Sequence, residues 1–230
     1  IGKSQNDKKC GELKAQLFLQ GWDNAIDVLE VFARANVAFT YVDVNVNGTF
    51  SRANQTEGRW ENIFANAASN WTRYNSDKEP LSNIKISARR CCWLNATVLQ
   101  AITTFGETLQ ELDLSDNLGG LYNVEGSDYV AESQHQLARG WRTSSVPTVS
   151  NAVVEDRDAE IGDRGAEITP AMLQYFSYGC NDNQVKGLKL TMKRCGLVSL
   201  HLKLLAEISL SSLDVSHQQP YLRQREALDE

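Results

Sequence analysis

The sequence lacks several features that would assign it to a common functional class. No run of 18 apolar residues occurs, so we expect no membrane-spanning helix. The formal net charge of −6 and the pI of about 5.2 come without a basic stripe, which argues against a nucleic-acid-binding protein. Phosphate-binding loops, dinucleotide-binding glycine motifs, zinc-protease motifs and the G-x-S-x-G nucleophile motif are all missing. We therefore expect a protein without catalytic activity and without a cofactor.

Cysteine and histidine are also scarce, with five of the first and three of the second. The odd cysteine count and the missing C-x-x-C spacing argue against a disulfide scaffold. The histidines do not cluster with the cysteines along the chain, so we expect no metal site. Reduced, mostly buried thiols favour an intracellular location. Four N-glycosylation sequons leave a secreted or extracellular location open, and they begin at Asn47, Asn54, Asn70 and Asn95.

One stretch, Leu109 to Asn117, has an unusual pattern. Its leucines fall at offsets 0, 3 and 5, and an asparagine follows at offset 8. A half-buried strand would alternate strictly, and an amphipathic helix would space its leucines by three and four over a longer run. The pattern L-x-x-L-x-L-x-x-N fits neither of these templates.

The same apolar offsets recur along the chain. They start at Leu81 and again at Leu109, 28 residues later, and at Val185 and again at Leu210, 25 residues later. Helical spacing of apolar residues fills both connectors, 94–105 and 197–208. A further copy starts at Phe39, with Asn47 at its offset 8, and both Cys91 and Cys195 fall at offset 10 of their copies. A repeat of one strand and one helix is therefore predicted.

This pattern resembles the leucine-rich repeat superfamily, in particular its ribonuclease-inhibitor-like or cysteine-containing type. The resemblance implies an α/β solenoid with a curved parallel sheet on the concave side and helices on the convex side. We expect one irregular domain over residues 1–230, with an insertion at 48–80 and a degenerate repeat region at 118–184. The degenerate repeat would use Val149, Ala152 and Val154 as its strand, with helices at 128–137 and 168–178. Near the N-terminus we expect a strand at 16–19 and a helix at 25–32.

In such a sheet the x residues of L-x-x-L-x-L point away from the core and line up on the concave face. We expect this face and the inserted loops to bind protein partners, as an interaction module or as a structural subunit of a larger assembly. The alternative is an extracellular recognition ectodomain of the same superfamily. The candidate partner-binding residues are Thr40, Tyr41, Asp43, Ser82, Asn83, Lys85, Gln110, Glu111, Asp113, Lys186, Lys189, Ser211, Ser212 and Asp214. Lys186 and Lys189 form a basic patch in this arrangement.

A second resemblance competes for the N-terminal part. A strand, a helix and the segment 36–44 are similar to the start of a thioredoxin-like or glutathione-transferase-like domain, and 145–148 is similar to its cis-proline loop. That family places its redox cysteine between the first strand and the first helix. Here Gly21 to Asn24 occupy those positions without a thiol, so the redox activity of the family is not expected.

Overall fold

The structure is a computed structural model, and it describes residues 12–49, 58–74, 77, 79–117 and 166–218. Strands and helices alternate along the chain in an α/β arrangement. The strands are β1 (Lys14–Phe18), β2 (Tyr41–Asn45), β3 (Asn83–Ser87), β4 (Leu109–Asp113), β5 (Leu188–Thr191) and β6 (Leu210–Asp214). The helices are α1 (Ala25–Arg34), α2 (Arg59–Trp71), α3 (Ala96–Thr103), the short 3-10 helix η2 (Gly106–Thr108), α6 (Pro170–Asp182) and α7 (Ser199–Leu205).

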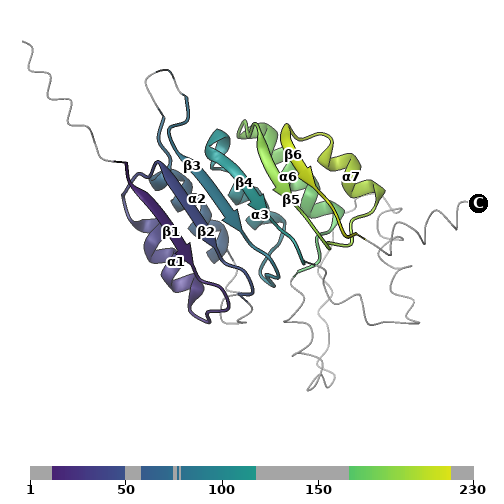
Figure 1. Ribbon diagram of the computed structural model, residues 1–230, viewed down its shortest axis with the longest axis horizontal. Helices are drawn as coiled ribbons and strands as arrows, with labels where there is room; N and C mark the ends of the chain where they lie inside the picture. Colours follow the sequence, from purple (N-terminus) through teal and green to yellow (C-terminus); the bar gives the residue numbers. More distant parts are fainter. Residues whose placement is uncertain (1–11, 50–57, 75–76, 78, 118–165, 219–230) are drawn as a thin grey trace, which may run out of the picture.

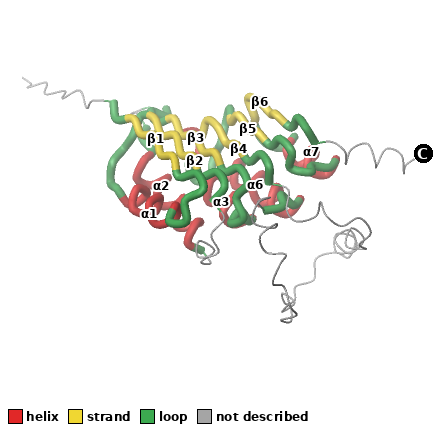
Figure 2. Tube along the Cα trace, turned by 60° about the horizontal axis from the view of Figure 1, so that its bottom comes forward, coloured by secondary structure: helices red, strands yellow, loops and turns green. Residues whose placement is uncertain are grey.

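The six strands form one open sheet, and every neighbouring pair is parallel. The strand order across the sheet equals the order along the chain. The α-helices lie against one face of this sheet, and each packs against the next one in the chain (Figures 1 and 2). The other face carries no described helix, so six strands present their outward side chains on it (Figure 2).

Alternation of apolar and polar residues explains why the sheet has one covered and one open face. A row of aliphatic side chains crosses all six strands on the helix side. It consists of Leu17, Val44, Ile86, Leu112, Leu190 and Leu213, which are partners in register. The four inner residues of this row are at most 2% exposed, whereas Leu213 in the edge strand β6 is 38% exposed. The core is therefore continuous under β2 to β5 and thins at β6.

The observed register corrects the predicted alignment of the repeats. Leu109 pairs with Ile84, and Leu210 pairs with Leu188. Leu81 precedes β3 and is 52% exposed, so it is not the counterpart of Leu109. The reason is one extra residue in β4 and in β6, where the register shifts against the preceding strand. The pattern L-x-x-L-x-L holds in those two strands, while β3 and β5 alternate strictly.

Residues 48–80 also differ from the expected insertion, because α2 lies there and connects β2 to β3. Trp60, Phe64 and Trp71 are buried in the core, and Trp60 stacks on Trp93 at a centroid distance of 3.8 Å. The predicted helix at 168–178 is present as α6. The predicted strand through Val149 to Val154, the predicted helix at 128–137 and the proline loop at 145–148 lie outside the described residues.

Each strand ends in the same turn. Four positions after each member of the aliphatic row, the backbone adopts a left-handed conformation, with φ between 53° and 68°. These six residues are Gly21, Gly48, Arg90, Asp116, Arg194 and His217. Four of them are not glycine, and a non-glycine residue in this region costs about 1–2 kcal/mol. Backbone hydrogen bonds between neighbouring turns offset that cost; for example, Gly48 N donates to Arg89 O at 2.8 Å and Asp116 N to Lys193 O at 2.8 Å.

From β2 onward, the residue after each left-handed position points into the protein and forms a buried ladder. Its members are Thr49, Cys91, Asn117, Cys195 and Gln218. Here a unit means one strand with the turn that follows it. Asn117 Nδ2 donates to Ala88 O in the preceding unit at 2.9 Å, and its Oδ1 accepts from Cys91 N at 2.8 Å. Cys91 Sγ donates to Val46 O and Cys195 Sγ to Leu114 O, both at 3.1 Å. Side chains of different chemistry therefore satisfy the same backbone groups in successive turns.

Candidate functional site

The open face of the sheet carries a central row of polar side chains. In register these are Gln16, Asp43, Lys85, Glu111, Lys189 and Ser212. The four inner strands, β2 to β5, contribute charges of alternating sign along the row. Because each side chain projects from the middle of a strand, the backbone hydrogen bonds of the sheet hold its Cα in place.

Glu111 is the centre of this row. Its carboxylate accepts from Lys85 Nζ at 2.9 Å and from Lys189 Nζ at 3.4 Å. The hydrogen bond from Lys85 is the main reason that the pKa of Glu111 is lowered, and the same bond raises the pKa of Lys85. Lys85 also lies 5.7 Å from the centroid of the Tyr41 ring, and Tyr41 Oη donates to Asp43 at 3.3 Å. Five predicted site residues thus form one connected surface network on β2 to β5.

Other predicted site residues lie near this network in different roles. Asn83 is the partner of Tyr41 in register, and its Oδ1 is buried without a hydrogen-bond partner among the described residues. Thr40 Oγ1 donates to Leu13 O at 3.1 Å, and Gln110 Nε2 to Glu107 O at 2.8 Å. Ser82 is only 4% exposed, and its hydroxyl binds the backbone of Phe39 and Arg73. Ser82 is therefore part of the interior and does not line the open face.

The two predicted aspartates at the strand ends stabilise turns. Asp113 Oδ1 accepts from Ser115 N at 2.9 Å, and Asp214 Oδ1 accepts from Ser216 N at 3.0 Å. Asp214 also pairs with Lys193 at 2.9 Å, and that hydrogen bond is the main reason that its pKa falls to about 2. Both carboxylates are thus already used by their own turns or neighbours.

The expected basic patch of Lys186 and Lys189 is neutralised. Lys186 pairs with Glu107 at 2.8 Å, and Lys189 pairs with Glu111 at 3.4 Å. Ser211 and Ser212 are exposed on the edge strand β6, and Ser211 Oγ donates to Gly187 O at 2.6 Å. The described part of the open face is therefore polar, with positive and negative charges in balance.

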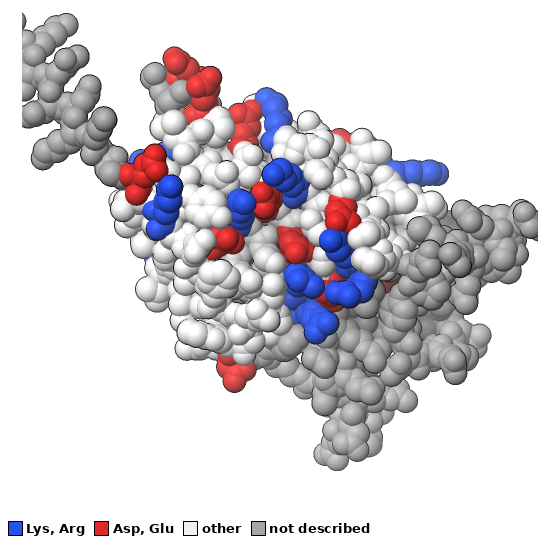
Figure 3. All heavy atoms as spheres, in the orientation of Figure 1, with Lys and Arg blue, Asp and Glu red and all other residues white. Residues whose placement is uncertain are grey.

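A basic cluster lies where β3, β4 and β5 end, and the sequence patterns did not reveal it. We call it the turn rim, and it consists of Arg89, Arg90, Lys193, Arg194 and the aspartate between them, Asp116. Figure 3 shows lysine and arginine side chains gathered around acidic ones at this end of the strands. The signal in the sequence was the two basic pairs 89–90 and 193–194, which the corrected register places at equivalent positions on either side of β4.

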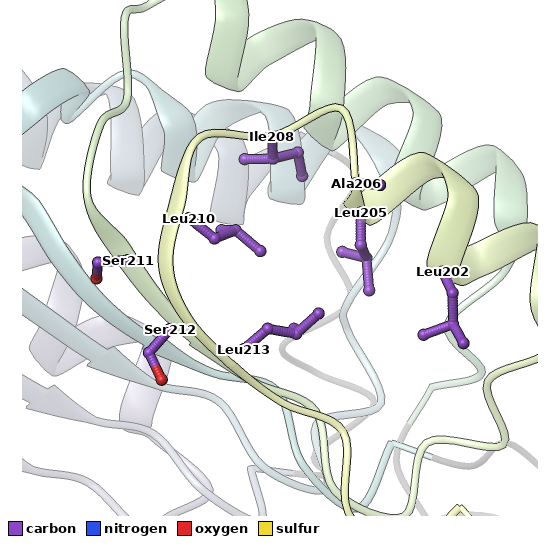
Figure 4. Close-up of a pocket in the computed structure, with 8 residues that line it drawn as sticks. All are labelled: Leu202, Leu205, Ala206, Ile208, Leu210, Ser211, Ser212 and Leu213. Carbon is purple, nitrogen blue, oxygen red and sulfur yellow. The ribbon is translucent and has the colours of Figure 1, made fainter.

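A shallow apolar groove lies at the outer side of β6 (Figure 4). It measures about 330 Å³ and is lined by Leu202, Leu205, Ala206, Ile208, Leu210, Ser211, Ser212 and Leu213. Leucines of α7 and β6 face one another across it (Figure 4). The groove exists because Leu213 has no further described strand beside it.

Three buried thiols are expected to resist alkylation. Burial raises the pKa of Cys91, Cys180 and Cys195 to about 12, so the reactive thiolate is scarce at pH 8. We expect iodoacetamide to modify the partly exposed Cys92 on the order of 100-fold faster than these three, because the thiolate is the nucleophile. Peptide mapping by mass spectrometry measures the rates, with guanidinium-unfolded protein as the control. Equal rates in the folded protein would contradict the burial.

Neither a metal centre nor a membrane span is found in the described part of the chain. Within it, no group of three or more histidine, cysteine, aspartate or glutamate side chains could hold a metal ion. None of the helices described is both long and apolar enough to cross a membrane. Comparison of the chain with family models, with curated proteins and with solved structures finds no match.

Proposed function

We propose that the chain is a leucine-rich-repeat solenoid of the ribonuclease-inhibitor-like or cysteine-containing type. In this proposal it is a non-catalytic module that binds protein partners through the open face of its sheet, as an interaction domain or as a subunit of a larger assembly. The observation that carries the proposal is the recurrence of one strand-and-turn unit six times in register.

The buried ladder supports a repeat origin. In a solenoid each unit contacts its neighbours, so equivalent positions in successive units meet the same backbone groups. Asn117, Cys91 and Cys195 each satisfy a carbonyl of the preceding unit from the same turn position. The sequence pattern put Asn117 at offset 8 and the two cysteines at offset 10, and the observed register makes these positions equivalent.

Rigidity of the open face supports a binding role. The side chains of β2 to β5 are attached to strands that are hydrogen-bonded on both sides, so little conformational entropy is lost when a partner binds. The network around Glu111 presents positive charges, negative charges and an aromatic ring on the same face of the sheet. Charge alternation of this kind favours a partner with complementary charges and disfavours others.

An intracellular location remains part of the proposal, and the sequon side chains support it. Asn70 Nδ2, the atom that a glycan would modify, donates to Ala33 O at 2.8 Å. Asn95 Oδ1 caps helix α3 by accepting from Val98 N at 2.8 Å. Asn47 Oδ1 accepts from Arg89 N at 2.8 Å. Three of the four sequon asparagines thus use their side chains within the fold.

Alanine at Tyr41 and Glu111 together is expected to reduce partner recovery at least about tenfold. The double variant removes the ring and the central carboxylate of the network, and about 1.4 kcal/mol of lost binding free energy corresponds to tenfold. Quantitative mass spectrometry of proteins co-purified with immobilised wild type and variant measures the difference. Exposed ion pairs contribute about 0.2–1 kcal/mol, so the thermal midpoint should change by only a few degrees.

The matched control carries alanine at Arg34 of α1 and Lys203 of α7, which are exposed on the helix side. This variant should recover the same proteins as the wild type. Equal recovery by the Tyr41 and Glu111 variant would remove the open face as the binding surface. Loss with the control variant alone would assign binding to the helices instead.

A further inference from the structure

We propose that the turn rim binds a short acidic peptide segment of a partner protein. The proposal concerns the ends of the strands and not the open face, so it does not rest on the binding role of that face. Arg89 and Arg90 follow β3, Lys193 and Arg194 follow β5, and Asp116 follows β4 between them. Their order in space follows from the sheet, in which β4 separates β3 from β5.

The turn rim has an excess of positive charge. Asp116 is 6% exposed and accepts from Arg89 Nη2 at 2.6 Å and from Arg194 Nε. Burial alone would raise the pKa of Asp116, but the hydrogen bonds from Arg194 and Arg89 lower it below its usual value, so it stays ionised at neutral pH. Lys193 pairs with Asp214. The four cations of the turn rim are therefore accompanied by two carboxylates, those of Asp116 and Asp214. These six groups together carry a net charge of +2.

Two observations point to an anionic group as the missing partner. Arg89 Nε is buried and has no acceptor among the described residues. Buried hydrogen-bond donors are almost always satisfied in folded proteins, so the Arg89 guanidinium, whose side chain is 40% exposed, keeps a donor for which the described residues supply no acceptor. The Arg90 side chain is exposed and makes no ion pair with any other described residue. A guanidinium group binds a carboxylate through two parallel hydrogen bonds, and the exposed Arg90 side chain can bind an incoming carboxylate in this way.

The backbone makes the turn rim rigid. Arg90 and Arg194 both occupy the left-handed position of their turns, with φ of 53°. Arg90 N donates to Ser115 O, and Arg194 N donates to Ser216 O, both at 3.4 Å. The two arginines therefore project from equivalent points two strands apart, a separation of about 10 Å at the usual strand spacing of about 4.8 Å.

This spacing and the overall charge favour an acidic peptide over a nucleic acid. In an extended peptide, carboxylates two to four residues apart are separated by about 7–13 Å, which brackets the spacing of the two arginines. A nucleic acid is a long polyanion, and the net charge of −6 on the whole chain would repel it. A short peptide with a few carboxylates is attracted by the nearby cations of the turn rim. It extends too little to be repelled strongly by the negative charges elsewhere on the protein.

Fluorescence anisotropy with a labelled twelve-residue peptide of alternating glutamate and serine tests the proposal. We expect saturable binding of this peptide by the intact chain, weakening as salt is raised, and no binding of the same peptide with glutamine in place of glutamate. The double variant Arg90→Gln, Arg194→Gln should bind at least about tenfold more weakly. The single variant Arg90→Gln removes no ion pair within the described residues, so it should fold normally and bind about threefold more weakly.

The matched control is the variant Arg34→Gln, Lys203→Gln, which removes the same charge from the helix side and should retain the wild-type affinity within about twofold. The proposal is overturned if the glutamate peptide does not bind. It is also overturned if both arginine variants bind like the wild type, or if the control variant loses as much affinity as the arginine double variant. Tighter binding of a single-stranded oligonucleotide of equal charge would identify the turn rim as a phosphate site and would likewise overturn it.

Discussion

Replacing Leu112 by alanine is expected to lower the free energy of unfolding by about 2–5 kcal/mol, the range for emptying a buried leucine site. Leu112 is 1% exposed and lies in β4, with Ile86 and Leu190 beside it in register on the two neighbouring strands. Helices cover this side of the sheet, so the cavity left by the substitution would not fill with solvent. Urea unfolding followed by circular dichroism measures the loss.

Leu213 supplies the matched control, because it occupies the same register position in β6 and is 38% exposed. Leu213→Ala removes the same atoms from a site that already contacts water, so we expect a loss of only about 1 kcal/mol. Similar losses at Leu112 and Leu213 would show that burial in this register does not determine stability.

The consequence of Leu112→Ala should also spread along the sheet. In a one-dimensional stack each strand depends on its neighbours, so weakening β4 separates β1–β3 from β5–β6. We expect hydrogen exchange to accelerate most in β5 and β6, which keep fewer neighbours than the three strands on the other side. Uniform acceleration across all six strands would mean that the sheet unfolds as a single unit.

Replacing Asn117 by alanine is expected to lower the free energy of unfolding by roughly 2–4 kcal/mol, because each buried group left without a partner costs about 1–3 kcal/mol. The Asn117 side chain is fully buried and makes its three shortest hydrogen bonds to backbone groups. Its amide donates to Ala88 O and to Leu114 O, and its carbonyl accepts from Cys91 N. Leu114 O keeps a second donor, the Cys195 thiol, which limits the total loss.

Two further variants distinguish the contribution of the buried ladder to stability from that of a half-buried turn residue. Asn117→Cys should lose less stability than Asn117→Ala, because a thiol at this position reaches the carbonyl of the preceding unit in two other turns. Asn47→Ala should lose less than about 1 kcal/mol, since Asn47 is only half-buried and water can replace its hydrogen bonds to Ser87 and Arg89. Chemical unfolding of the three variants in parallel tests this order. An Asn47 loss equal to that of Asn117 would contradict the role given to burial.

The alternation of strands and helices could be predicted from the sequence, because apolar periodicity is a local property. The six strands predicted at 16–19 and at the five copies of the pattern are present in the α/β structure, with ends shifted by a few residues. The helices predicted at 25–32, 94–105, 168–178 and 197–208 are present as α1, α3, α6 and α7. Helix α2 was missed because 48–80 is rich in asparagine, serine and threonine, although Trp60, Phe64, Ala67 and Trp71 follow helical spacing.

The register could not be predicted, because the L-x-x-L-x-L pattern fits a strand in more than one frame. A bulge in a strand places two apolar residues three positions apart, and an apolar residue three positions before a strictly alternating strand, such as Leu81 before Ile84 and Ile86, gives the same spacing. Aligning Leu81 with Leu109 pairs Ile84 with Leu112, whereas in the structure Leu112 pairs with Ile86. The predicted alignment was therefore wrong by two residues. In the observed frame Cys91 and Cys195 take the position of Asn117, and their hydrogen bonds become understandable.

By itself, the sequence determined which segments bury an apolar face and that successive strands would be joined by helices, since these depend on neighbours along the chain. Only the tertiary structure decided which polar side chains remain available. Ser82, Asp113 and Asp214 are used by the backbone around them, whereas Arg89, Arg90, Lys193 and Arg194 meet across three strands. The physical reason is that hydrogen bonds and charges act over distances in space, and the sheet brings together residues more than 100 positions apart in the chain.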